Sequence, residues 1–467
     1  MSLKVYNSLS RKKEEFQSIT PGHVGMYVCG PTVSGESHLG HARPYITFDV
    51  VYRYLVHLGY KVRYVRNITD AGHFEEEGRE AVDKISIKAV VEKLEPMELV
   101  QKYTNMFHWA MKQFNNVEPS IEPTATGHIL EQIELIETLL TNGFAYVVDG
   151  SVYFDVKKYN ETHGYGILSG RNIEELMAGY RDLDGQDEKR NSIDFALWKK
   201  APEEHIMRWN SPWGPGFPGW HIECSAMAMK YLGEHFDVHT GGIEHIPVHH
   251  TNEIAQSECA TGTPYVNYWM HNNHLLDTTG KMSKSNGEFL TVSTLRDKGY
   301  NPLAYRYFLL TAHYRKELSF SFEALDAASV AYKKLVEFMV AHKDSNGSAI
   351  KEYENLVLTA LSDDLATPEA IATIWKLMKD GNINDDDKHA TLLTINEYLG
   401  LGLEKVEGNV VEIPEAVQEL LYKRKEARAS RNFTLSDTLR DEIASHGFMV
   451  KDTENGQEIS KLEKQIQ

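Results

Sequence analysis

Residues 24–58 limit the possible folds of this chain more than any other stretch. The apolar run Val24–Val28 is typical of a buried strand, and Ala42–Leu58 has the apolar spacing of a helix. The turn between them, Cys29–His41, holds three glycines, a proline, a thiol and two imidazoles. A strand, a glycine-containing turn and a helix form a ready anion site, because free backbone N–H groups and the helix N-terminus point at the ligand. The stretch therefore predicts phosphate binding at its helix end and a soft metal ligand, Cys29, at its strand end.

The next apolar run indicates that this strand belongs to a parallel sheet. Val62–Val65 has the length and composition of a second strand, and it follows the helix directly. Such a strand–helix–strand unit predicts a parallel sheet. The charged run Glu75–Lys102 that comes next is typical of an exposed helical connection.

A hairpin signal interrupts this parallel pattern. Residues 127–142 repeat apolar positions at helical spacing. Two strand-like runs follow, Ala145–Val148 and Ser151–Val156, and Asp149-Gly150 joins them. That dipeptide between two apolar runs is a strong hairpin signal. We therefore expect an inserted domain at about residues 117–202.

In the second half of the chain the residue pattern changes twice, first to a loop-like composition and then to helical spacing. The segment 211–220 is rich in Trp, Gly and Pro, which predicts a shaped loop. Beyond residue 302 apolar stripes predict helices at 303–313, 322–343, 352–361, 367–379 and 387–398. A linker at 404–413 then precedes a small terminal unit with one basic helix, 421–443. This unit carries a basic patch made of Lys423, Arg424, Lys425, Arg428, Arg431 and Arg440.

The composition excludes some classes of protein. Hydrophobic residues make up 42% and charged residues 25% of 467 positions, as in an ordinary globular protein of two to four domains. No apolar run approaches the length of a membrane span, and the first residues lack the apolar core of a signal peptide. The only cysteines, Cys29, Cys224 and Cys259, are too few for a disulfide framework, and Cys259 is typical of a core thiol. We therefore expect a cytoplasmic location. A formal net charge of −18 argues against general nucleic-acid binding.

Four residues form a candidate metal site. His249 and Glu253 are four residues apart, so on a helix they share one face. Cys29 and Cys224 each lie where a turn meets a helix. Two thiols, an imidazole and a carboxylate suit zinc, which accepts sulfur, nitrogen and oxygen ligands in a tetrahedron. His250 competes with His249, because it lies three residues before Glu253. The alternative is that these cysteines are plain buried or surface thiols and that the histidine caps a helix.

Two further motifs indicate nucleotide binding. His38-Leu39-Gly40-His41 places two imidazoles around a glycine at a helix start, where they can donate hydrogen bonds to phosphate oxygens. The loop that runs from Lys281 through Lys284 is bracketed by glycines, so its two lysines can close over a triphosphate. Alone, each motif is equally typical of solvated side chains. Together with the candidate metal site they predict a nucleotide-dependent enzyme.

The order of these motifs resembles the signature pair of class I aminoacyl-tRNA synthetases. Further segments make the chain similar to the cysteinyl-tRNA synthetases in particular. They are Met-Tyr-Val-Cys-Gly-Pro-Thr-Val at 26–33, Asn-Ile-Thr-Asp at 67–70, Gly-Trp-His-Ile-Glu-Cys-Ser-Ala-Met at 219–227, His-Thr-Gly-Gly at 239–242, and His-His with Asn-Glu-Ile-Ala-Gln at 249–256. The resemblance runs from about Lys4 to the end of the chain and is weakest in the terminal unit.

The resemblance implies an ATP-dependent ligation of cysteine to its tRNA through a cysteinyl-adenylate. It implies one zinc ion per chain, which binds the substrate thiol and is held by Cys29, Cys224, His249 and Glu253; it thus favours His249 over His250. It implies that four residues stabilise the charge on the phosphates: His38, His41, Lys281 and Lys284. It also implies that ATP is bound by Gly40, His41 and Lys284, and that Mg²⁺ bridges the ATP phosphates. It implies an amino-acid pocket lined by Thr69, Trp220 and His239.

The resemblance also implies an architecture. The expected fold class is α/β, with a Rossmann-like parallel-sheet catalytic domain, an inserted α+β domain, a helical bundle and a small C-terminal unit. The expected boundaries are 1–116 for the first half of the catalytic domain, 117–202 for the insert, 203–302 for the second half with the lysine loop, 303–403 for the bundle and 404–467 for an anticodon-binding unit. The expected partners are cysteine, ATP and tRNA(Cys), with no membrane, and we expect a monomer.

The chain departs from the family pattern at Ser34–Ser37, at Asn286–Glu288 and at Phe217. Three other functions were weighed against the tRNA ligase. A ligase that joins activated cysteine to a small amine would lack the terminal unit. A non-catalytic tRNA-binding relative would have lost histidines or lysines from the signature motifs. A zinc hydrolase would need an open position for a catalytic water, which four protein ligands do not leave.

Overall fold

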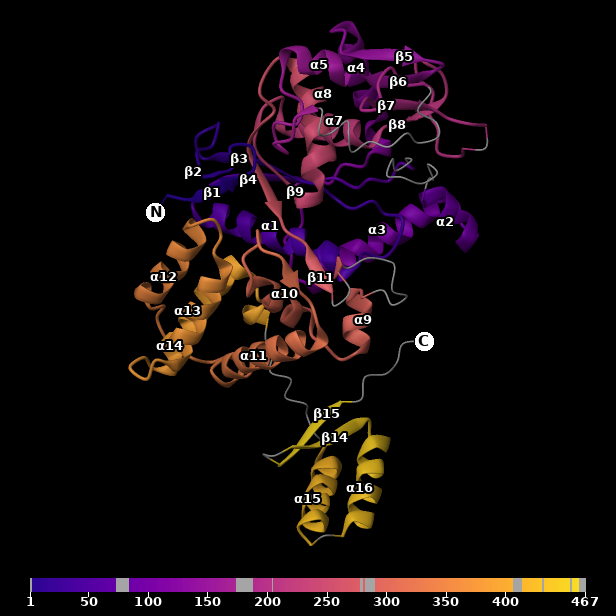
Figure 1. The fold of residues 1–467 in the computed structure, drawn as a ribbon. Coiled ribbons are helices and arrows are strands. Elements are labelled where there is room, and N and C mark those ends of the chain that lie inside the picture. The colour runs from indigo at the N-terminus through magenta and orange to yellow at the C-terminus, as the bar shows by residue number, and fades with distance from the viewer. Residues whose placement is uncertain are drawn as a thin grey trace. The chain divides into compact units, whose positions relative to one another are not determined.

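The computed structural model describes residues 2–72, 84–173, 188–203, 205–277, 280–281, 290–405, 414–430, 432–453 and 456–461. The chain divides into two compact units, Met1–Lys405 and Val406–Gln467, and each is described by itself (Figure 1).

A four-stranded parallel sheet lies at the centre of the larger unit. Its strands, in spatial order, are β10 (Val266–Asn272), β9 (Phe236–Gly242), β3 (His23–Val28) and β4 (Lys61–Arg66), and every neighbouring pair is parallel. Helix α1 (Leu39–His57) connects β3 to β4. The strand–helix–strand unit expected from the sequence is therefore confirmed.

The sheet is buried because both of its faces are covered. Every residue of β9 is buried, and Met26, Tyr27 and Val28 at the end of β3 are completely inaccessible. A sheet covered on both faces needs nearly continuous apolar strands, which explains why Val24–Val28 carries no polar residue. Helix α1 buries its apolar side, including Ile46, against this core.

A second, antiparallel sheet takes three strands from the expected insert, residues 117–202, and a fourth from beyond its expected end. Its order is β5 (Ala145–Val148), β6 (Ser151–Phe154), β7 (Phe195–Lys200) and β8 (Gly216–Pro218). Asp149 and Gly150 both have positive φ, 45° and 84°, as a tight hairpin turn of this kind requires. Figure 1 shows helices α4 (Ile129–Thr141) and α5 (Val156–Thr162) packed around this sheet.

Strand β8 lies inside the segment 211–220 that was expected to be a loop, so that expectation is wrong for Gly216–Pro218. The composition is poor for a strand, but β8 is an edge strand, where proline is tolerated. Gly216 is required here, because a side chain would meet the Trp198 indole and the Lys199 carbonyl at under 2.5 Å.

The remaining elements of the larger unit surround these two sheets. Before the insert they are β1 (Lys4–Asn7), β2 (Lys12–Glu15), α2 (Lys84–Glu92), α3 (Pro96–Gln113) and η1 (Thr126–His128). After it they are α7 (Trp220–Leu232), η2 (Ile243–His245), the π-helical turn η3 (Ile246–His250), α8 (Thr251–Thr261), β11 (Leu275–Asp277), β12 (Gly280–Lys281), α9 (Val292–Asp297) and β13 (Leu318–Ser319). The helices that end the unit are α10 (Pro302–Leu310), α11 (Phe322–Ala341), α12 (Lys351–Ser362), α13 (Thr367–Lys379), α14 (Asp385–Leu399) and η5 (Leu403–Lys405). Helices α10 to α14 agree with the five expected from the apolar stripes.

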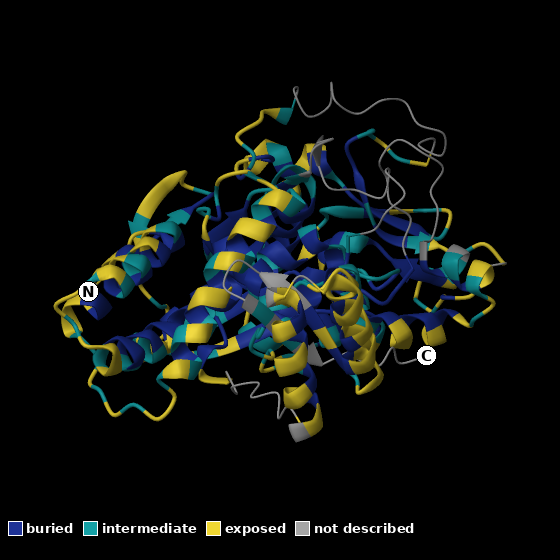
Figure 2. Ribbon diagram, turned by 90° about the horizontal axis from the view of Figure 1, so that it is seen from below, coloured by how far each residue is buried: buried dark blue, intermediate teal, exposed yellow. Residues whose placement is uncertain are grey.

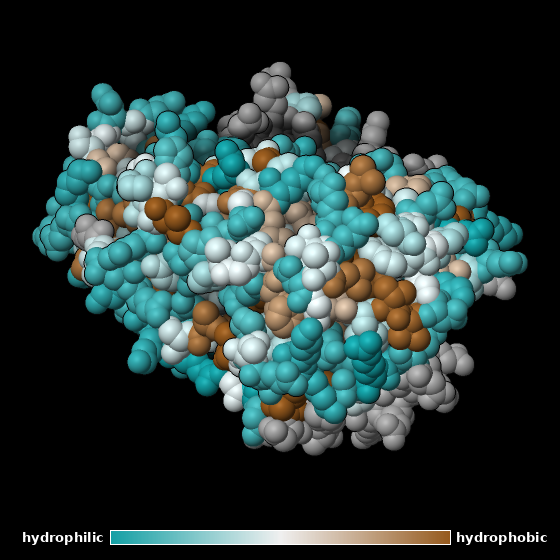
Figure 3. All heavy atoms as spheres, turned by 90° about the horizontal axis from the view of Figure 1, so that it is seen from above, coloured by the Kyte–Doolittle hydropathy of each residue, from teal (hydrophilic) through white to brown (hydrophobic). Residues whose placement is uncertain are grey.

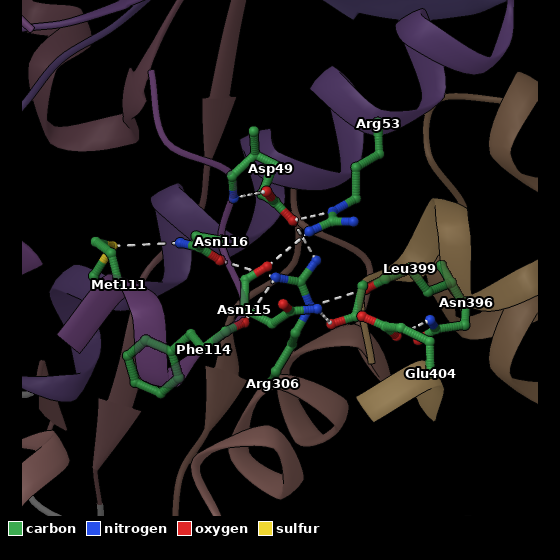
Figure 4. Close-up of polar contacts among 12 residues, drawn as sticks. Asp49, Arg53, Met111, Phe114, Asn115, Asn116, Arg306, Asn396, Leu399 and Glu404 are labelled. Atoms are coloured by element: carbon green, nitrogen blue, oxygen red, sulfur yellow. Dashed lines mark hydrogen bonds and ion pairs between the residues drawn. The ribbon is translucent and has the colours of Figure 1, made fainter. Parts of the chain in front are cut away.

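A buried ion pair joins these last helices to α1. The guanidinium of Arg306, on α10, lies 2.5 Å from a carboxylate oxygen of Asp49, on α1, and neither side chain is more than 3% exposed (Figure 4). Arg53 donates to the same Asp49 oxygen at 2.7 Å. Arg306 also donates to the Phe114 carbonyl, the Asn116 side-chain oxygen and the Leu399 carbonyl. One residue of α10 thus connects α1, the segment after α3 and the end of α14.

The smaller unit consists of two helices and a hairpin. The helices are α15 (Glu415–Ala429) and α16 (Phe433–Ser445), and the strands are β14 (Phe448–Thr453) and β15 (Gly456–Lys461). The single basic helix expected at 421–443 is therefore wrong. The side chain of Asn432 accepts a hydrogen bond from the Leu435 N–H, so Asn432 caps a new helix in the middle of that range.

The basic patch of this unit is also smaller than the sequence suggested. Arg424 is completely buried and donates to the side chain of Gln457 in β15. Lys423 is exposed but pairs with Glu419 one turn earlier on α15. Arg431 lies outside the described residues. Lys425 and Arg428 are both exposed on this helix, and Arg428 also interacts with another group.

Many helices carry buried residues along one side and exposed residues along the other (Figure 2), whereas α7, α8 and α10 are buried over most of their length. On the face seen in Figure 3, hydrophilic side chains surround separate small hydrophobic patches. Among the described residues, no helix combines the length and the hydropathy that a membrane span requires.

Candidate active site

The site is built first from two loops that leave adjacent parallel strands. Cys29 follows the last residue of β3, and the segment Asn67–Asp70 follows β4. The two loops run side by side, because Thr32 and Thr69 form a bridge and the Gly30 N–H donates to the Asn67 side chain at 2.8 Å. Gly30 is required, since a Cβ there would lie 1.5 Å from the Asn67 carbonyl oxygen. Ligands of open parallel sheets bind at this carboxyl edge.

Two helices bring the other half of the site to the same edge. Cys224 lies one turn into α7, and His249 and Glu253 lie on the continuous helical segment of η3 and α8. The His249 Nε2 and Glu253 Oε1 atoms are 3.0 Å apart, which confirms that this i,i+4 pair shares one helix face. Cys29 approaches from β3, whose end is joined to β9 by the hydrogen bond from Cys29 N–H to the Thr240 carbonyl.

Three of the four predicted metal ligands form a compact cluster with His250, and the fourth, Cys224, lies beside it. Ligand atoms of Cys29, His249, His250 and Glu253 all lie within 4.8 Å of one another, and all four residues are buried. The Cys29 sulfur is 3.3 Å from Nε2 of His250. Cys224 is buried beside Cys29 and His249 and interacts with both. The compact cluster therefore contains three of the four predicted ligands, with His250 in the place predicted for Cys224, and the assignment of Cys224 stays a prediction.

The charges of this cluster are strongly shifted. Burial raises the pKa of the Cys29 thiol well above its usual value. Interaction with Cys29, aided by His249, lowers the pKa of Cys224 to about 6 although burial opposes this shift. Burial also disfavours charge on His249, but Glu253 and the Cys224 thiolate raise its pKa to about 10. Burial alone would raise the pKa of Glu253, but His239 and His249 hold it well below its usual value.

These donors fit a soft divalent cation. A thiolate, an imidazole and a carboxylate at one buried point form the mixed sulfur, nitrogen and oxygen set that zinc accepts. Outer partners are in place as well: His239 Nε2 lies 2.9 Å from Glu253 Oε2, and His250 Nδ1 lies 2.7 Å from His271 Nε2. Such outer contacts fix the orientation of metal ligands.

The phosphate motif lies at the start of α1. His38 occupies the N-cap position and His41 lies in the first turn, with their rings stacked at a centroid distance of 3.6 Å. The Leu39 N–H donates to the Leu290 carbonyl at 2.7 Å, and His38 forms a bridge with Thr291. The segment that follows the lysine loop is therefore fixed to the helix start that carries both histidines.

The lysine loop itself is only partly described. The backbone of Lys281 belongs to β12, which pairs with β11. Its side chain and all of Lys284, like the departure at Asn286–Glu288, lie outside the described residues. The roles of both lysines stay a prediction.

Two of the three pocket residues, Trp220 and His239, lie against candidate metal ligands. Thr69 is buried at the end of β4 and accepts a hydrogen bond from Asn67. The Trp220 ring, at the start of α7, lies 4.2 Å from the His249 ring. His239 is completely buried on β9 behind Glu253, where it acts as an outer partner. The role of these residues as an amino-acid pocket also stays a prediction.

Two contributors were missed by the sequence reasoning. Tyr27 on β3 lies beside Cys224 and Cys29, and His271 on β10 supports His250 and lies 2.8 Å from the Ser8 hydroxyl. No local pattern marks either residue, because only the pairing of β3, β9 and β10 brings them to this point.

Comparisons with known proteins identify the family. Residues 15–330 match the profile of the class I (C) tRNA synthetase catalytic domain. A cysteine–tRNA ligase of Phocaeicola vulgatus is 49% identical over 482 aligned positions, which cover 97% of this chain and 98% of the relative. The chain belongs to the cysteine–tRNA ligase family. Cysteine–tRNA ligases of Porphyromonas gingivalis and Chlorobaculum tepidum are 48% and 46% identical, each over 98% of this chain.

The fold of this family member agrees with solved class I enzymes. A methionyl-tRNA synthetase of Mycobacterium tuberculosis, bound to methionyl-adenylate, superimposes with a TM-score of 0.56 and 15% identity over 82% of this chain and 93% of that one. A leucyl-tRNA synthetase of Agrobacterium radiobacter superimposes with a TM-score of 0.58 and 13% identity over 84% and 86%. The expected Rossmann-like α/β fold is thus confirmed.

The smaller unit decides between two of the alternatives considered above. Residues 411–459 match the profile of the cysteinyl-tRNA ligase anticodon-binding domain. A ligase that joins cysteine to a small amine is expected to lack such a unit, so this match favours the tRNA enzyme.

Proposed function

We propose that the chain ligates cysteine to tRNA(Cys) in two steps that consume ATP. The cysteine carboxylate attacks the α-phosphate and forms cysteinyl-adenylate and pyrophosphate, and the terminal ribose hydroxyl of the tRNA then attacks the activated carbonyl. The observation that carries the proposal is the buried cluster of Cys29, His249 and Glu253 at the sheet edge from which α1 begins. The likeness to cysteine–tRNA ligases over nearly the whole chain supports it.

We assign one zinc ion per chain to Cys29, Cys224, His249 and Glu253. Bound zinc would act as a Lewis acid that favours a thiolate over a hydroxyl as an added ligand. His250 is the weaker candidate, because the Cys224 thiolate is the softer donor and His250 already has His271 as a neighbour at 2.7 Å. The ligand residues exclude water from the substrate thiol, since all of them are buried.

The chain's own cations and N–H groups would stabilise the phosphate charge. His38 and His41 lie at the positive end of α1, whose dipole favours a phosphate. Gly40 allows the ligand to approach the backbone. Lys281 and Lys284 would close on the phosphates from the loop whose end is fixed at Leu290, and Mg²⁺ would neutralise charge between the phosphates.

The pocket and the domains complete the proposal. Thr69, Trp220 and His239 would enclose the amino acid beside the metal site. The catalytic domain would comprise 1–116 and 203–302, with the insert at 117–202, the bundle at 303–403 and the anticodon-binding unit at 404–467. We further propose that the protein works as a monomer in the cytoplasm, where Cys29 and Cys224 stay reduced.

Cysteine-dependent exchange of labelled pyrophosphate into ATP tests the enzyme proposal. The full chain, supplied with zinc and magnesium, is expected to exchange pyrophosphate with cysteine but not in its absence. A chain with intact fold and bound zinc that shows no cysteine-dependent exchange would refute the proposed activity.

A further inference from the structure

Glu223 is a buried carboxylate that forms no ion pair among the described residues. It lies in the first turn of α7, one residue before Cys224, and none of its surface is accessible. Among the residues that the structure describes, no hydrogen bond reaches either carboxylate oxygen of Glu223. Ionised groups are almost never buried in this way unless an opposite charge is present, because loss of hydration disfavours the charged form strongly. Glu223 therefore needs a hydrogen-bond donor, and a cationic donor would satisfy it best.

The surroundings of Glu223 place it at the amino-acid site. Trp220, Glu223 and Cys224 share one face of α7, because they are spaced three and four residues apart. On that face the Trp220 ring contacts the His249 ring at 4.2 Å, and Cys224 interacts with Cys29. Glu223 thus shares its helix face with one candidate metal ligand and with one candidate pocket residue.

The groups that face Glu223 do not supply the missing cation. Cys224 and Asp70 face it with negative charge, the Thr69 hydroxyl lies near it, and His249 is the one basic group in this set. His249 already lies 3.0 Å from Glu253.

Two structural explanations for Glu223 do not hold. A carboxylate in a first helical turn can bind free N–H groups of its own helix, but neither of its oxygens accepts one here. A role as a metal ligand has less support than for Cys224: both lie outside the set of ligand atoms within 4.8 Å of one another, but only Cys224 has side-chain contacts to Cys29 and His249. Asp70 differs from it, since its oxygens accept from the Thr126 N–H at 2.8 Å and from the Thr126 hydroxyl at 2.5 Å.

We propose that Glu223 binds the α-ammonium group of the cysteine substrate. The assignment rests on the proposed function. In cysteine two carbon atoms separate the thiol from the amino group, so an anchor for the amine must lie close to the groups that hold the thiol. Glu223 meets this condition as the sequence neighbour of Cys224. With thiol and ammonium held at two points, the substrate carboxylate is left to face the nucleotide site. The ammonium group persists in the adenylate, so the same anchor holds the intermediate for the second step.

Binding of two thiol ligands tests the proposal on the zinc-loaded full chain. L-Cysteine carries the ammonium group, and 3-mercaptopropionate has the same thiol and carboxylate without it. Titration calorimetry is expected to show that the wild type binds cysteine at least about a hundredfold more tightly, because a buried polar group rejects a ligand that leaves it unpaired. In Glu223→Gln the affinity for cysteine should fall about a hundredfold, while that for 3-mercaptopropionate changes less than about threefold.

The outcomes separate the possible failures. Equal affinity of the wild type for both ligands would overturn the Glu223 assignment, and this result needs no variant to fold. Equal weakening of both ligands in Glu223→Gln, with zinc content unchanged, would assign Glu223 a purely structural role and also overturn it. Glu223→Asp is expected to keep part of the preference for cysteine. If the wild type binds neither ligand and shows no exchange activity, the proposed function fails and this inference fails with it.

Discussion

The ion pair between Arg306 and Asp49 offers a quantitative test of how the helical end of the larger unit is held to α1. We consider Arg306→Met, which keeps the bulk of the side chain and removes its charge. Removing one partner of a buried ion pair costs about 3–5 kcal/mol. Arg53 still faces Asp49 at 2.7 Å and reduces this cost. Three oxygens lose their donor, however, and each adds about 1 kcal/mol. With the lower end of that range, about 3 kcal/mol, and about 3 kcal/mol for the three oxygens, we expect the free energy of unfolding to fall by about 6 kcal/mol at pH 7.

Chemical denaturation followed by tryptophan fluorescence can measure this loss. All seven tryptophans precede residue 406, so their fluorescence reports only on the larger unit. Asp49→Asn combined with Arg306→Met is the matched control. It removes the uncompensated charge and should recover at least about 1 kcal/mol of the loss.

The pH dependence gives the same test a second readout. Burial alone would raise the pKa of Asp49, but Arg306 and Arg53 hold it below its usual value. The stabilisation by Asp49 is therefore present above the unfolded pKa of about 4 and is lost as the pH falls through the native pKa. Without Arg306 the pKa of Asp49 rises, so the difference between wild type and variant should shrink from pH 7 toward pH 4. A loss under about 1 kcal/mol, or one that grows toward pH 4, would refute the account of this contact.

Three other predictions concern the site and the smaller unit. Cys224→Ser should reduce bound zinc far below one per chain while His250→Gln retains it, as measured by metal analysis after dialysis; the reverse order would exchange their roles. Lys284→Ala should slow pyrophosphate exchange about a hundredfold or more and leave cysteine affinity unchanged, because the lysine acts on charge that develops in the transition state; an unchanged exchange rate would remove it from the mechanism. Lys425→Gln should weaken tRNA binding and lower its salt dependence by about one phosphate contact, whereas Arg424→Gln should mainly lower the melting temperature, since Arg424 is buried; a salt dependence that Lys425→Gln leaves unaltered would exclude that contact.

Local sequence patterns predicted the helices, strands and turns whose apolar spacing or turn residues are distinctive. The apolar run Val24–Val28 and the helix after it follow from spacing alone, and Asp149-Gly150 sets a turn that needs two positive φ angles. The five helices after residue 302 were equally readable, because each presents one apolar side to the core.

The sequence did not predict features that depend on contacts between distant parts of the chain. Strand β8 exists because β7 pairs with it, although its Gly- and Pro-containing sequence is typical of a loop. Arg424 looked like part of an exposed basic patch, but it is buried against Gln457 from the following hairpin. The break before α16 depends on the Asn432 cap, a signal that the basic residues around it concealed.

The sequence predicted those site residues that belong to recognisable motifs. Spacing proposed His249 with Glu253, and the family resemblance selected Cys29 and Cys224 from distant parts of the sequence. The packing of α7, α8 and β3 against one another places His250 beside Cys29. The same packing leaves the carboxylate oxygens of Glu223 buried without a hydrogen bond. Residue spacing could predict neither of these two features, because helix periodicity does not say which side of a helix faces a neighbouring strand.

Charging of tRNA(Cys) tests the central claim, that a metal centre built on Cys29, Cys224, His249 and Glu253 selects the substrate by its thiol. The measurement compares cysteine with serine on the zinc-loaded chain and on the same chain after zinc removal. We predict that cysteine is charged with a preference over serine far above the roughly hundredfold limit of a pocket that selects by shape, and that zinc removal abolishes charging until zinc is restored. Charging of serine at a comparable rate, or undiminished selection of cysteine by the zinc-free chain, would contradict the account.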